Sequence, residues 1–575
     1  MANFNIDAQA LNTYDAIVVG SGISGGWSAK ELTAKGLRTL VLERGRDVRH
    51  ITDYPTTNMQ PWEFEHRGQL RKEVKDANPI ISKCYAFYEG TEQFFVKDAE
   101  HPYVQEKPFD WIRGYQVGGK SLMWARQTQR WSDFDFTGPA RDGFAVDWPI
   151  RYADLAPWYS YVEKFAGITG NKDGLDTLPD GEFLTPHEWN CVETHFQKQI
   201  ASKYKDRHVI MGRAAHLTSP KQIHYDQGRA QCQHRTICER GCPFGGYFSS
   251  NSSTIPWAAK TGKMTLRPDS VVHSIIYDEK KGRATGVRVI DANTKQMTEY
   301  YARLIFVNAA ALNTNLILLN STSSRFPNGL GNDSGTLGKY VAFHNYRAGI
   351  SGEYDGNLDM TTDGRRPNSP YIPRFRNVYK QETSGPASRF LRGYAAGFQA
   401  GRSSQTDMSG MGADLKQSLL NPKLGGWHVG SHMMGETIPK ESNYVALDPS
   451  LKDPYGIPQL KIAIAYDDND EKMIKDYQEQ MTEMFQAAGF TNIRLRDDKR
   501  NPGLDIHEMG GVRMGKDPKT SMLNKWNQLH AVKNVFVTDG ASMTSTSTQN
   551  PSLTYMAFSA RSVDYAVKAM KKGLV

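Results

Sequence analysis

The chain of 575 residues is long enough for several domains, and its composition is that of a folded protein. The hydrophobic fraction is 39%, and 70 Lys and Arg against 62 Asp and Glu give a net charge of only +8. These values exclude a disordered chain, and the absence of long runs of like charge argues against a nucleic-acid partner. No stretch of about 18 apolar residues predicts a membrane span, and residues 1–20 lack the features of a signal peptide.

The first recognisable unit is a strand, loop, helix and strand over residues 15–42, followed directly by an acidic residue. Glycines in such a loop let a pyrophosphate approach the helix N-terminus, and the acid can accept hydrogen bonds from an adenosine ribose. The order of these elements predicts dinucleotide binding. The residues concerned are Gly20, Gly22, Gly25 and Glu43.

The middle of the chain is less regular. Residues 51–109 carry no motif, and we expect an excursion over the surface or towards the active site. A second glycine-rich loop contains Gly118, Gly119 and Ser121, and an apolar run at 534–538 leads into Asp539 and Gly540. The patterns predict strands at 264–266, 271–277, 284–290 and 303–307, and helices at about 468–489 and 552–572.

Three of the five cysteines, Cys232, Cys238 and Cys242, lie close together in the sequence. Five cysteines are too few for a disulfide framework in a chain of this length, so the cluster indicates a metal or redox site. A zinc site would want a fourth ligand, for which His234 is the obvious local choice. Inert structural thiols are a further alternative.

These motifs resemble those of the glucose–methanol–choline (GMC) flavoprotein oxidoreductases. They include the N-terminal unit, the second glycine loop, the run 307–321, the Gly335-x-x-Gly338 segment that ends at His344, and two C-terminal motifs. The resemblance implies an α/β protein in which an α+β substrate domain with a mostly antiparallel sheet accompanies a Rossmann-like FAD-binding domain. The FAD-binding domain would consist of residues 1–50, 110–150, 225–340 and 500–575, and the substrate domain of 151–224 and 341–499.

The two C-terminal motifs begin at His507 and at Gln549-Asn550. In the family such a histidine and asparagine face the reactive edge of the flavin, so the resemblance implies His507 and Asn550 as the catalytic pair. Imidazole, with an unperturbed pKa of about 6.5, can take the hydroxyl proton of an alcohol while the amide holds the same oxygen. His344 belongs to a motif that is mainly structural in the family, and we expect it to lie outside the site.

The resemblance also implies how FAD is held. Gly118, Gly119, Ser121, Asp539 and Gly540 are expected to contact the cofactor beside the N-terminal unit. Sugar oxidases of the family can carry a histidine that is joined covalently to the flavin, two positions after the serine; here that position is Met123. We therefore expect non-covalent FAD.

Cys232, Cys238 and Cys242 resemble the cysteines of bacterial sugar dehydrogenase catalytic subunits, where three thiolates hold a three-iron four-sulfur (3Fe-4S) cluster. The resemblance implies a glucoside 3-dehydrogenase or a related FAD glucose dehydrogenase. Such an enzyme would oxidise the ring hydroxyl at C3 of glucose or a glycoside. Its electrons would pass through the iron–sulfur cluster to cytochrome c. Glucose 1-dehydrogenase, another polyol dehydrogenase, or an oxygen-using pyranose oxidase with inert cysteines are the alternatives. A non-enzymatic flavin or zinc module is disfavoured by the catalytic pair.

Partners and location follow from the same resemblance. Related catalytic subunits lack their own signal and cross the inner membrane with a small signal-bearing subunit. We therefore expect such a subunit, a cytochrome c subunit, and a periplasmic enzyme associated peripherally with the membrane. Residence in the cytoplasm explains the N-terminal sequence equally simply.

Overall fold

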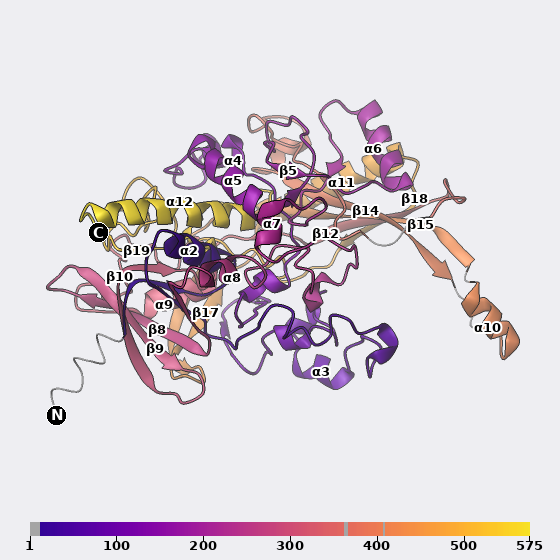
Figure 1. Ribbon diagram of the computed structural model, residues 1–575. Helices are drawn as coiled ribbons and strands as arrows, with labels where there is room; N and C mark the ends of the chain where they lie inside the picture. The colour runs from indigo at the N-terminus through magenta and orange to yellow at the C-terminus, as the bar shows by residue number, and fades with distance from the viewer. Residues whose placement is uncertain (1–11, 362–365, 406–408, 422) are drawn as a thin grey trace.

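The computed structural model describes residues 12–361, 366–405, 409–421 and 423–575, and two large sheets organise them (Figure 1). Residues 1–11, in which the sequence shows no signal-peptide features, lie outside the described residues. Within the described ranges, no helix combines the length and the apolar character needed to cross a membrane.

The first sheet is mixed and has seven strands, in the order β7-β2-β1-β10-β9-β8, with β19 beside β10. The pairs β7-β2, β2-β1, β1-β10 and β10-β19 are parallel, whereas β10-β9 and β9-β8 are antiparallel. The helix α2 connects β1 to β2 and so forms the predicted βαβ unit. The bounds are β1 (Thr13–Val19), α2 (Ile23–Ala34), β2 (Thr39–Leu42), β7 (Met264–Arg267), β8 (Ser270–Asp278), β9 (Arg283–Asp291), β10 (Met297–Val307) and β19 (Val535–Phe536).

Helices cover the parallel part of this sheet, which is why its strands are continuous apolar runs. All four residues of β2 are buried, and so are the last four of β1. The long C-terminal helix packs along α2 and α5, and Figure 1 shows it lying across the top of this half of the molecule. The covering helices are α5 (Tyr152–Ala166), α8 (Thr254–Ala259), α9 (Ala311–Asn320) and α12 (Ser552–Lys571).

The second sheet is antiparallel, in the order β18-β12-β15-β14-β13-β6, with β11 beside β15. Alternate residues of β15, among them Trp427 and Met433, pack against Met473 and Tyr477 of α11. The residues between them point to the opposite face, as the two-residue period of a strand requires. The bounds are β6 (Ile210–Met211), β11 (His344–Asn345), β12 (Ala348–Tyr354), β13 (Pro370–Ile372), β14 (Tyr394–Gln405), β15 (Lys423–Glu436), β18 (Thr491–Asp497), α6 (Cys191–Lys203) and α11 (Asp468–Ala487).

A buried ion network attaches this second sheet to α4 (Asp133–Asp142). Glu436 at the end of β15 accepts from Arg392 (2.9 Å) and pairs with Arg374 (2.7 Å). The same two arginines reach Asp142 (2.8 Å) and Asp135 (3.1 Å) of α4. Because Glu436 stands opposite His344 in the register of β15 and β11, the network also fixes β11 in place.

Residues 51–109 form short helical turns that fold over the second glycine-rich loop. Tyr54, Phe87 and Phe94 from this segment share an apolar cluster with Leu122 and Met123 of the loop. The segment therefore closes one wall of the site described below. Its elements are η1 (Pro61–Glu63), α3 (Lys72–Ala77), η2 (Ile81–Lys83), η3 (Glu92–Phe94) and β3 (Val104–Gln105), and the loop itself contains η4 (Gly119–Leu122).

The remaining elements are short or peripheral. The strands β16 and β17 form a small sheet with β3, and β4 pairs with β5. In Figure 1, α10 stands away from the body, beyond the ends of β14 and β15. These elements are β4 (Ile168–Thr169), β5 (Phe183–Leu184), α7 (Gln222–Asp226), η5 (Cys238–Arg240), η6 (Pro386–Arg389), α10 (Ala413–Leu420), β16 (Tyr444–Lys452), β17 (Pro458–Ala463) and η7 (Gly540–Ser542).

The expected helices at 468–489 and 552–572 are confirmed by α11 and α12 within two residues. The strand expected at 303–307 is the end of the longer β10, whose first half pairs with β9. The expected strand before Asp539 is shorter than its apolar run. It ends at Phe536 because the next backbone N–H groups turn away, Val537 to the Asn527 carbonyl and Thr538 to the Asn308 side chain.

Candidate functional site

A cavity of about 410 Å³ lies between the carboxyl ends of β1, β2, β10 and β19 and the face of the second sheet that the helices leave bare. Ligand sites of α/β proteins occur at such strand ends. The cavity brings together most of the predicted site residues. Its lining includes Gly20, Gly22, Glu43, Gly119, Ser121, His507, Asp539, Gly540 and Asn550, whereas Gly25, Gly118 and the three clustered cysteines are outside it.

The two glycine-rich loops touch each other in the cavity wall. A Cβ on Gly119 would lie 3.3 Å from Cα of Gly22, and a Cβ on Gly22 would meet nothing within 4 Å. Gly25 lies beneath, where a Cβ would come within 1.9 Å of the Gly20 carbonyl oxygen. Gly22 precedes the first turn of α2, which has no acidic residue. This open backbone cradle at a helix N-terminus fits a pyrophosphate such as that of FAD.

Glu43 ties the two loops together. Its Oε2 accepts from the backbone N–H (3.1 Å) and the hydroxyl (2.6 Å) of Ser21, and Oε1 accepts from the N–H of Gly45 (3.1 Å). Gly118 N–H in turn donates to the Ser21 hydroxyl (2.9 Å). Burial raises the pKa of Glu43. Its position at the end of β2, on the cavity wall, suits a ribose contact.

A row of hydrogen bonds fixes the ring orientation of His507. Nε2 of His344 lies 2.6 Å from the carbonyl oxygen of Ser547, which can only accept, so Nε2 carries the proton. Burial lowers the pKa of His344 to about 4, so Nδ1 is an acceptor. It lies 2.9 Å from Nδ1 of His507, which therefore donates. Nε2 of His507 is left with a lone pair, 3.2 Å from the Nδ2 donor of Asn550.

His344 was expected outside the site, and it does not line the cavity, but it hydrogen-bonds His507 directly. Its ring contacts His507 with centroids 5.0 Å apart, because β11 places it against the segment before the catalytic motif. Burial, His344 and the charge of Lys120 hold the pKa of His507 well below its usual value. A neutral His507 whose Nε2 is unprotonated can act as a proton acceptor.

Asp505 was not identified from the sequence, although it stands two residues before His507. Its Oδ2 accepts from the N–H groups of His344 (2.9 Å) and His507 (3.3 Å). One oxygen lies within 4.8 Å of a ring nitrogen of each histidine. Burial, reinforced by Glu508, raises the pKa of Asp505 to about 7. The signal available in the sequence was an acidic residue two positions before the histidine of the motif.

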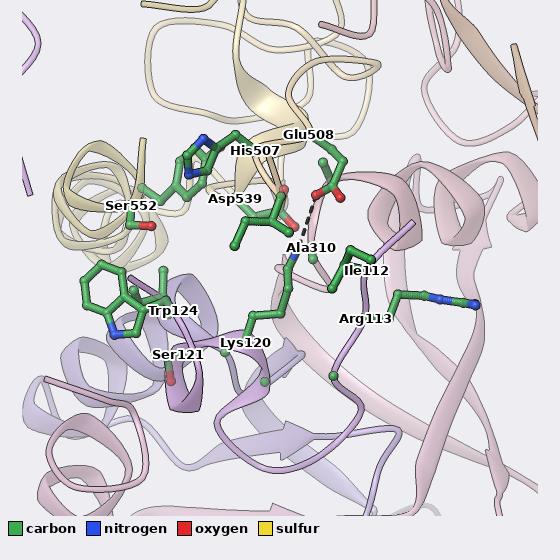
Figure 2. Close-up of a pocket in the computed structure, with 18 of the residues that line it drawn as sticks. Ile112, Arg113, Lys120, Ser121, Trp124, Ala310, His507, Glu508, Asp539 and Ser552 are labelled. Atoms are coloured by element: carbon green, nitrogen blue, oxygen red, sulfur yellow. Dashed lines mark hydrogen bonds and ion pairs between the residues drawn. The ribbon is translucent and has the colours of Figure 1, made fainter. Parts of the chain in front are cut away.

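Lys120 and Glu508 form an ion pair across the cavity that the sequence did not predict. Figure 2 shows Lys120 extending from the glycine-rich loop to Glu508, with Nζ 3.1 Å from Oε2. The second oxygen of Glu508 is buried, and among the described residues it has no hydrogen-bond partner. A cofactor hydroxyl or amide fits this unused acceptor.

Asp539 and Ser121 are held by the protein as well as lining the cavity. Asp539 Oδ2 accepts from the Thr314 hydroxyl (2.6 Å), and Oδ1 accepts from the Ala541 N–H (3.0 Å). Burial raises the pKa of Asp539 to about 6. The Ser121 hydroxyl donates to the Gly118 carbonyl (2.5 Å) and accepts from the Ser250 N–H (3.0 Å). These bonds hold both side chains in place at the cavity wall.

The clustered cysteines lie just behind the cavity. Arg126 lines the cavity and pairs with Glu239 at 3.1 Å, directly after Cys238. Burial raises the pKa of the Cys238 thiol to about 12. The sulfurs of Cys232, Cys238 and Cys242 are not all within 4.8 Å of one another, as the only such group among the described residues is that of His344, Asp505 and His507. Tetrahedral zinc would hold its sulfurs about 3.8 Å apart, so this spacing does not suit a closed zinc site.

Comparison with known proteins agrees with the site. The family model of the GMC oxidoreductase N-terminal domain matches residues 14–344, and that of the C-terminal domain matches residues 439–559. The 2-methyl-1,2-propanediol dehydrogenase of Mycolicibacterium austroafricanum is 28% identical, with 96% of this chain and 94% of that protein covered. The fructose dehydrogenase large subunit of Gluconobacter japonicus is 26% identical, with 97% and 98% covered.

A solved structure shows the same fold. Formate oxidase of Aspergillus oryzae superposes with a TM-score of 0.61 at 13% identity, over 98% of this chain and 99% of that one. The matched ranges include the glycine-rich loops, His507 and Asn550. The chain is an FAD-dependent enzyme acting on CH–OH groups, and it belongs to the GMC oxidoreductase family.

Proposed function

We propose that this enzyme is a dehydrogenase that oxidises a ring hydroxyl, the one at C3, of glucose or a glucoside to the keto sugar. The observation that carries the proposal is the row His344–His507–Asn550, which leaves Nε2 of His507 as a proton acceptor on the cavity wall. When bound, FAD supplies the hydride acceptor, N5. Two relatives named for the oxidation of a diol and of a sugar support a polyhydroxylated substrate.

The residues in and around the cavity would have separate roles in alcohol oxidation. Nε2 of His507 takes the hydroxyl proton as the carbon loses its hydride and the C=O bond forms. Asn550, with its amide 3.2 Å from Nε2, holds the same oxygen and orients the C–H bond. The carboxylate of Asp505 is close enough to stabilise the imidazolium that results.

The proposed FAD contacts are non-covalent. Gly20, Gly22 and Gly119 would carry the pyrophosphate, supported from behind by Gly25 and Gly118, and Glu43 would contact the ribose. Ser121, Asp539 and Gly540 would contact the rest of the cofactor. Met123 is buried, and its sulfur accepts from Nε2 of Gln116 (3.4 Å). Met123 lacks the imidazole nitrogen that forms the flavin linkage in the covalent sugar oxidases, so acid precipitation should release the yellow cofactor into the supernatant.

We further propose that Cys232, Cys238 and Cys242 hold an iron–sulfur cluster of the 3Fe-4S type, through which electrons leave for cytochrome c. Thiolates are the usual ligands of such clusters. Cys238 and Cys242 pack against the core that also contains the cavity wall residue Trp124, so the donor set lies next to the cofactor cavity.

The test of the cluster is replacement of each cysteine by serine. Each variant should lose iron and the paramagnetic signal of the oxidised protein, and should no longer reduce cytochrome c. Sugar should still bleach its flavin in one anaerobic turnover. Cys191→Ser, at the half-buried first residue of α6, is the matched control and should keep the iron. A wild type purified without iron under argon contradicts the cluster and favours the oxygen-using alternative.

The proposed setting is the periplasm, with a small signal-bearing subunit and a cytochrome c subunit as partners. Support comes from the name of the fructose dehydrogenase relative, which is one subunit of its enzyme. Fractionation of cells and identification of proteins that copurify with the chain test both points. A chain found alone in the cytoplasm contradicts them.

The decisive measurement for the reaction is the visible spectrum under argon, before and after addition of methyl α-D-glucoside. We expect the flavin to be bleached and the product to be the 3-keto glucoside. A product oxidised at C1 of glucose identifies the 1-dehydrogenase alternative, and bleaching only by a small diol identifies another polyol dehydrogenase. Rapid hydrogen peroxide formation in air identifies an oxidase.

A further inference from the structure

The face of the second sheet that looks into the cavity carries a histidine outside every motif. Along β15 the odd-numbered residues from Trp427 to Met433 are buried towards α11, so the even-numbered residues point the other way. Two of these, His432 and Met434, line the cavity that also contains His507. His432 therefore belongs to the substrate side of the site.

The surroundings of His432 leave its ring free to bind. It stands opposite Gly397 of β14, where a Cβ would come within 2.3 Å of its Cε1 and 2.7 Å of its Nε2. The glycine is thus what gives the ring its room. Tyr346 meets the ring edge to face, with centroids 5.0 Å apart. No group of the described residues hydrogen-bonds either ring nitrogen, and the half-buried ring leaves both nitrogens accessible from the cavity.

We propose that His432 is a substrate-binding residue, whose imidazole hydrogen-bonds a hydroxyl of the substrate other than the one being oxidised. The inference rests on the proposed sugar oxidation and names a residue that selects polyhydroxylated substrates. A neutral imidazole offers one donor and one acceptor, which matches a hydroxyl group. Burial, with a smaller effect from Arg496, lowers the pKa of His432 to about 4, so the ring is neutral at physiological pH.

A polar ring that lines a mostly apolar cavity and has no protein partner is left to hydrogen-bond water or a ligand. A packing role alone would be filled equally well by an apolar residue, as Met434 does on the same strand. The unused nitrogens and the space kept by Gly397 both point to an occupant. That occupant carries hydroxyl groups on more than one carbon, since His507 takes the hydroxyl that reacts.

The test is anaerobic stopped-flow reduction of the bound flavin by methyl α-D-glucoside and by each of its monodeoxy analogues. In His432→Ala we expect the apparent Kd of the glucoside to rise about tenfold, the worth of roughly one hydrogen bond, with the limiting rate nearly unchanged. His432→Gln, which keeps a hydrogen-bonding group, should recover part of the affinity. One deoxy analogue, which lacks the hydroxyl that His432 binds, should bind the wild type weakly. The same analogue should show no further loss of affinity for His432→Ala.

His428 provides the matched control. It lies four residues earlier on the same face of β15 but is exposed and outside the cavity, so His428→Ala should behave as wild type. Wild-type affinity in His432→Ala, with normal bleaching of the wild type, overturns the inference alone. An equal loss for every analogue and for 2-methyl-1,2-propanediol also overturns it, because that indicates a distorted site. No bleaching of the wild type by any sugar overturns the proposed function and the inference together.

Discussion

The cofactor half and the substrate half of the cavity are built in different ways. The cofactor half consists of loops that follow β1, β2, β10 and β19, and two of its glycines, Gly22 and Gly119, bring the backbones of two loops into contact at the cavity wall. The substrate half consists of side chains on one face of an antiparallel sheet, such as His432 opposite Gly397. Backbone recognition requires glycine at fixed spacings, which a sequence displays, whereas a sheet face requires only alternation, which many residue types satisfy.

The largest effect should come from removing the group at which the two halves meet. His507→Ala should lower the anaerobic rate of flavin reduction by about 10²–10⁴-fold, the usual contribution of a positioned proton acceptor. FAD content should stay unchanged, because the ring lies beyond the glycine cradle. Asn550→Ala should lose less, since it orients the substrate and takes no proton. Wild-type rates at neutral pH in His507→Ala would leave the motif with a structural role only.

A substitution at Gly25 should disrupt the cofactor half of the cavity most directly. A Cβ there would come within 1.9 Å of the Gly20 carbonyl, and forcing an atom into such a contact costs about 1–3 kcal/mol. We expect Gly25→Ala to bind FAD about 10- to 100-fold more weakly, measured by flavin fluorescence after dilution. Gly426→Ala, at a position with nothing within 4 Å, is the control and should retain FAD as wild type does. Equal retention in both variants would show that the loop can yield.

The same difference explains what the sequence could predict. The βαβ unit, Glu43 and the pair of His507 and Asn550 all come from local patterns, and the structure brings them to one cavity. The contact of His344 with His507 could not be predicted, because the two residues are 163 positions apart in the sequence. The packing of the segment 51–109 could not be predicted either, because this irregular segment packs through scattered aromatic residues that follow no periodic pattern.

A smaller effect is expected at His344, which acts on His507 and does not line the cavity. Without its Nδ1 acceptor, Nδ1–H of His507 loses its partner and the ring can adopt the other tautomer. His344→Ala should lower the limiting rate of flavin reduction about tenfold with little change in substrate affinity, the signature of a positioning residue. His344→Gln offers an acceptor again and should restore part of the rate. Equal rates in the two variants would mean that the histidine only fills space.

The smallest expected effect concerns Asp505, whose ionisation makes the stability of the folded protein depend on pH. Its folded-state pKa of about 7 is above the ordinary value of 3.8, so the folded protein binds the proton more tightly than the unfolded chain. The stabilisation from this proton is complete below about pH 4 and is lost as the pH rises to about 7. Asp505→Asn keeps an oxygen for the N–H groups of His344 and His507 but does not titrate.

The melting temperature of Asp505→Asn relative to wild type should therefore increase from pH 5 to pH 8, by about 2 °C in a long chain. Calorimetry at matched ionic strength measures this difference, with Asp226→Asn, at an exposed position of α7, as the matched control. A flat difference for Asp505→Asn would mean that the carboxyl is already ionised at pH 5. The charge facing His507 would then be present throughout the working pH range, and the site would need no proton loss before it accepts one from the substrate.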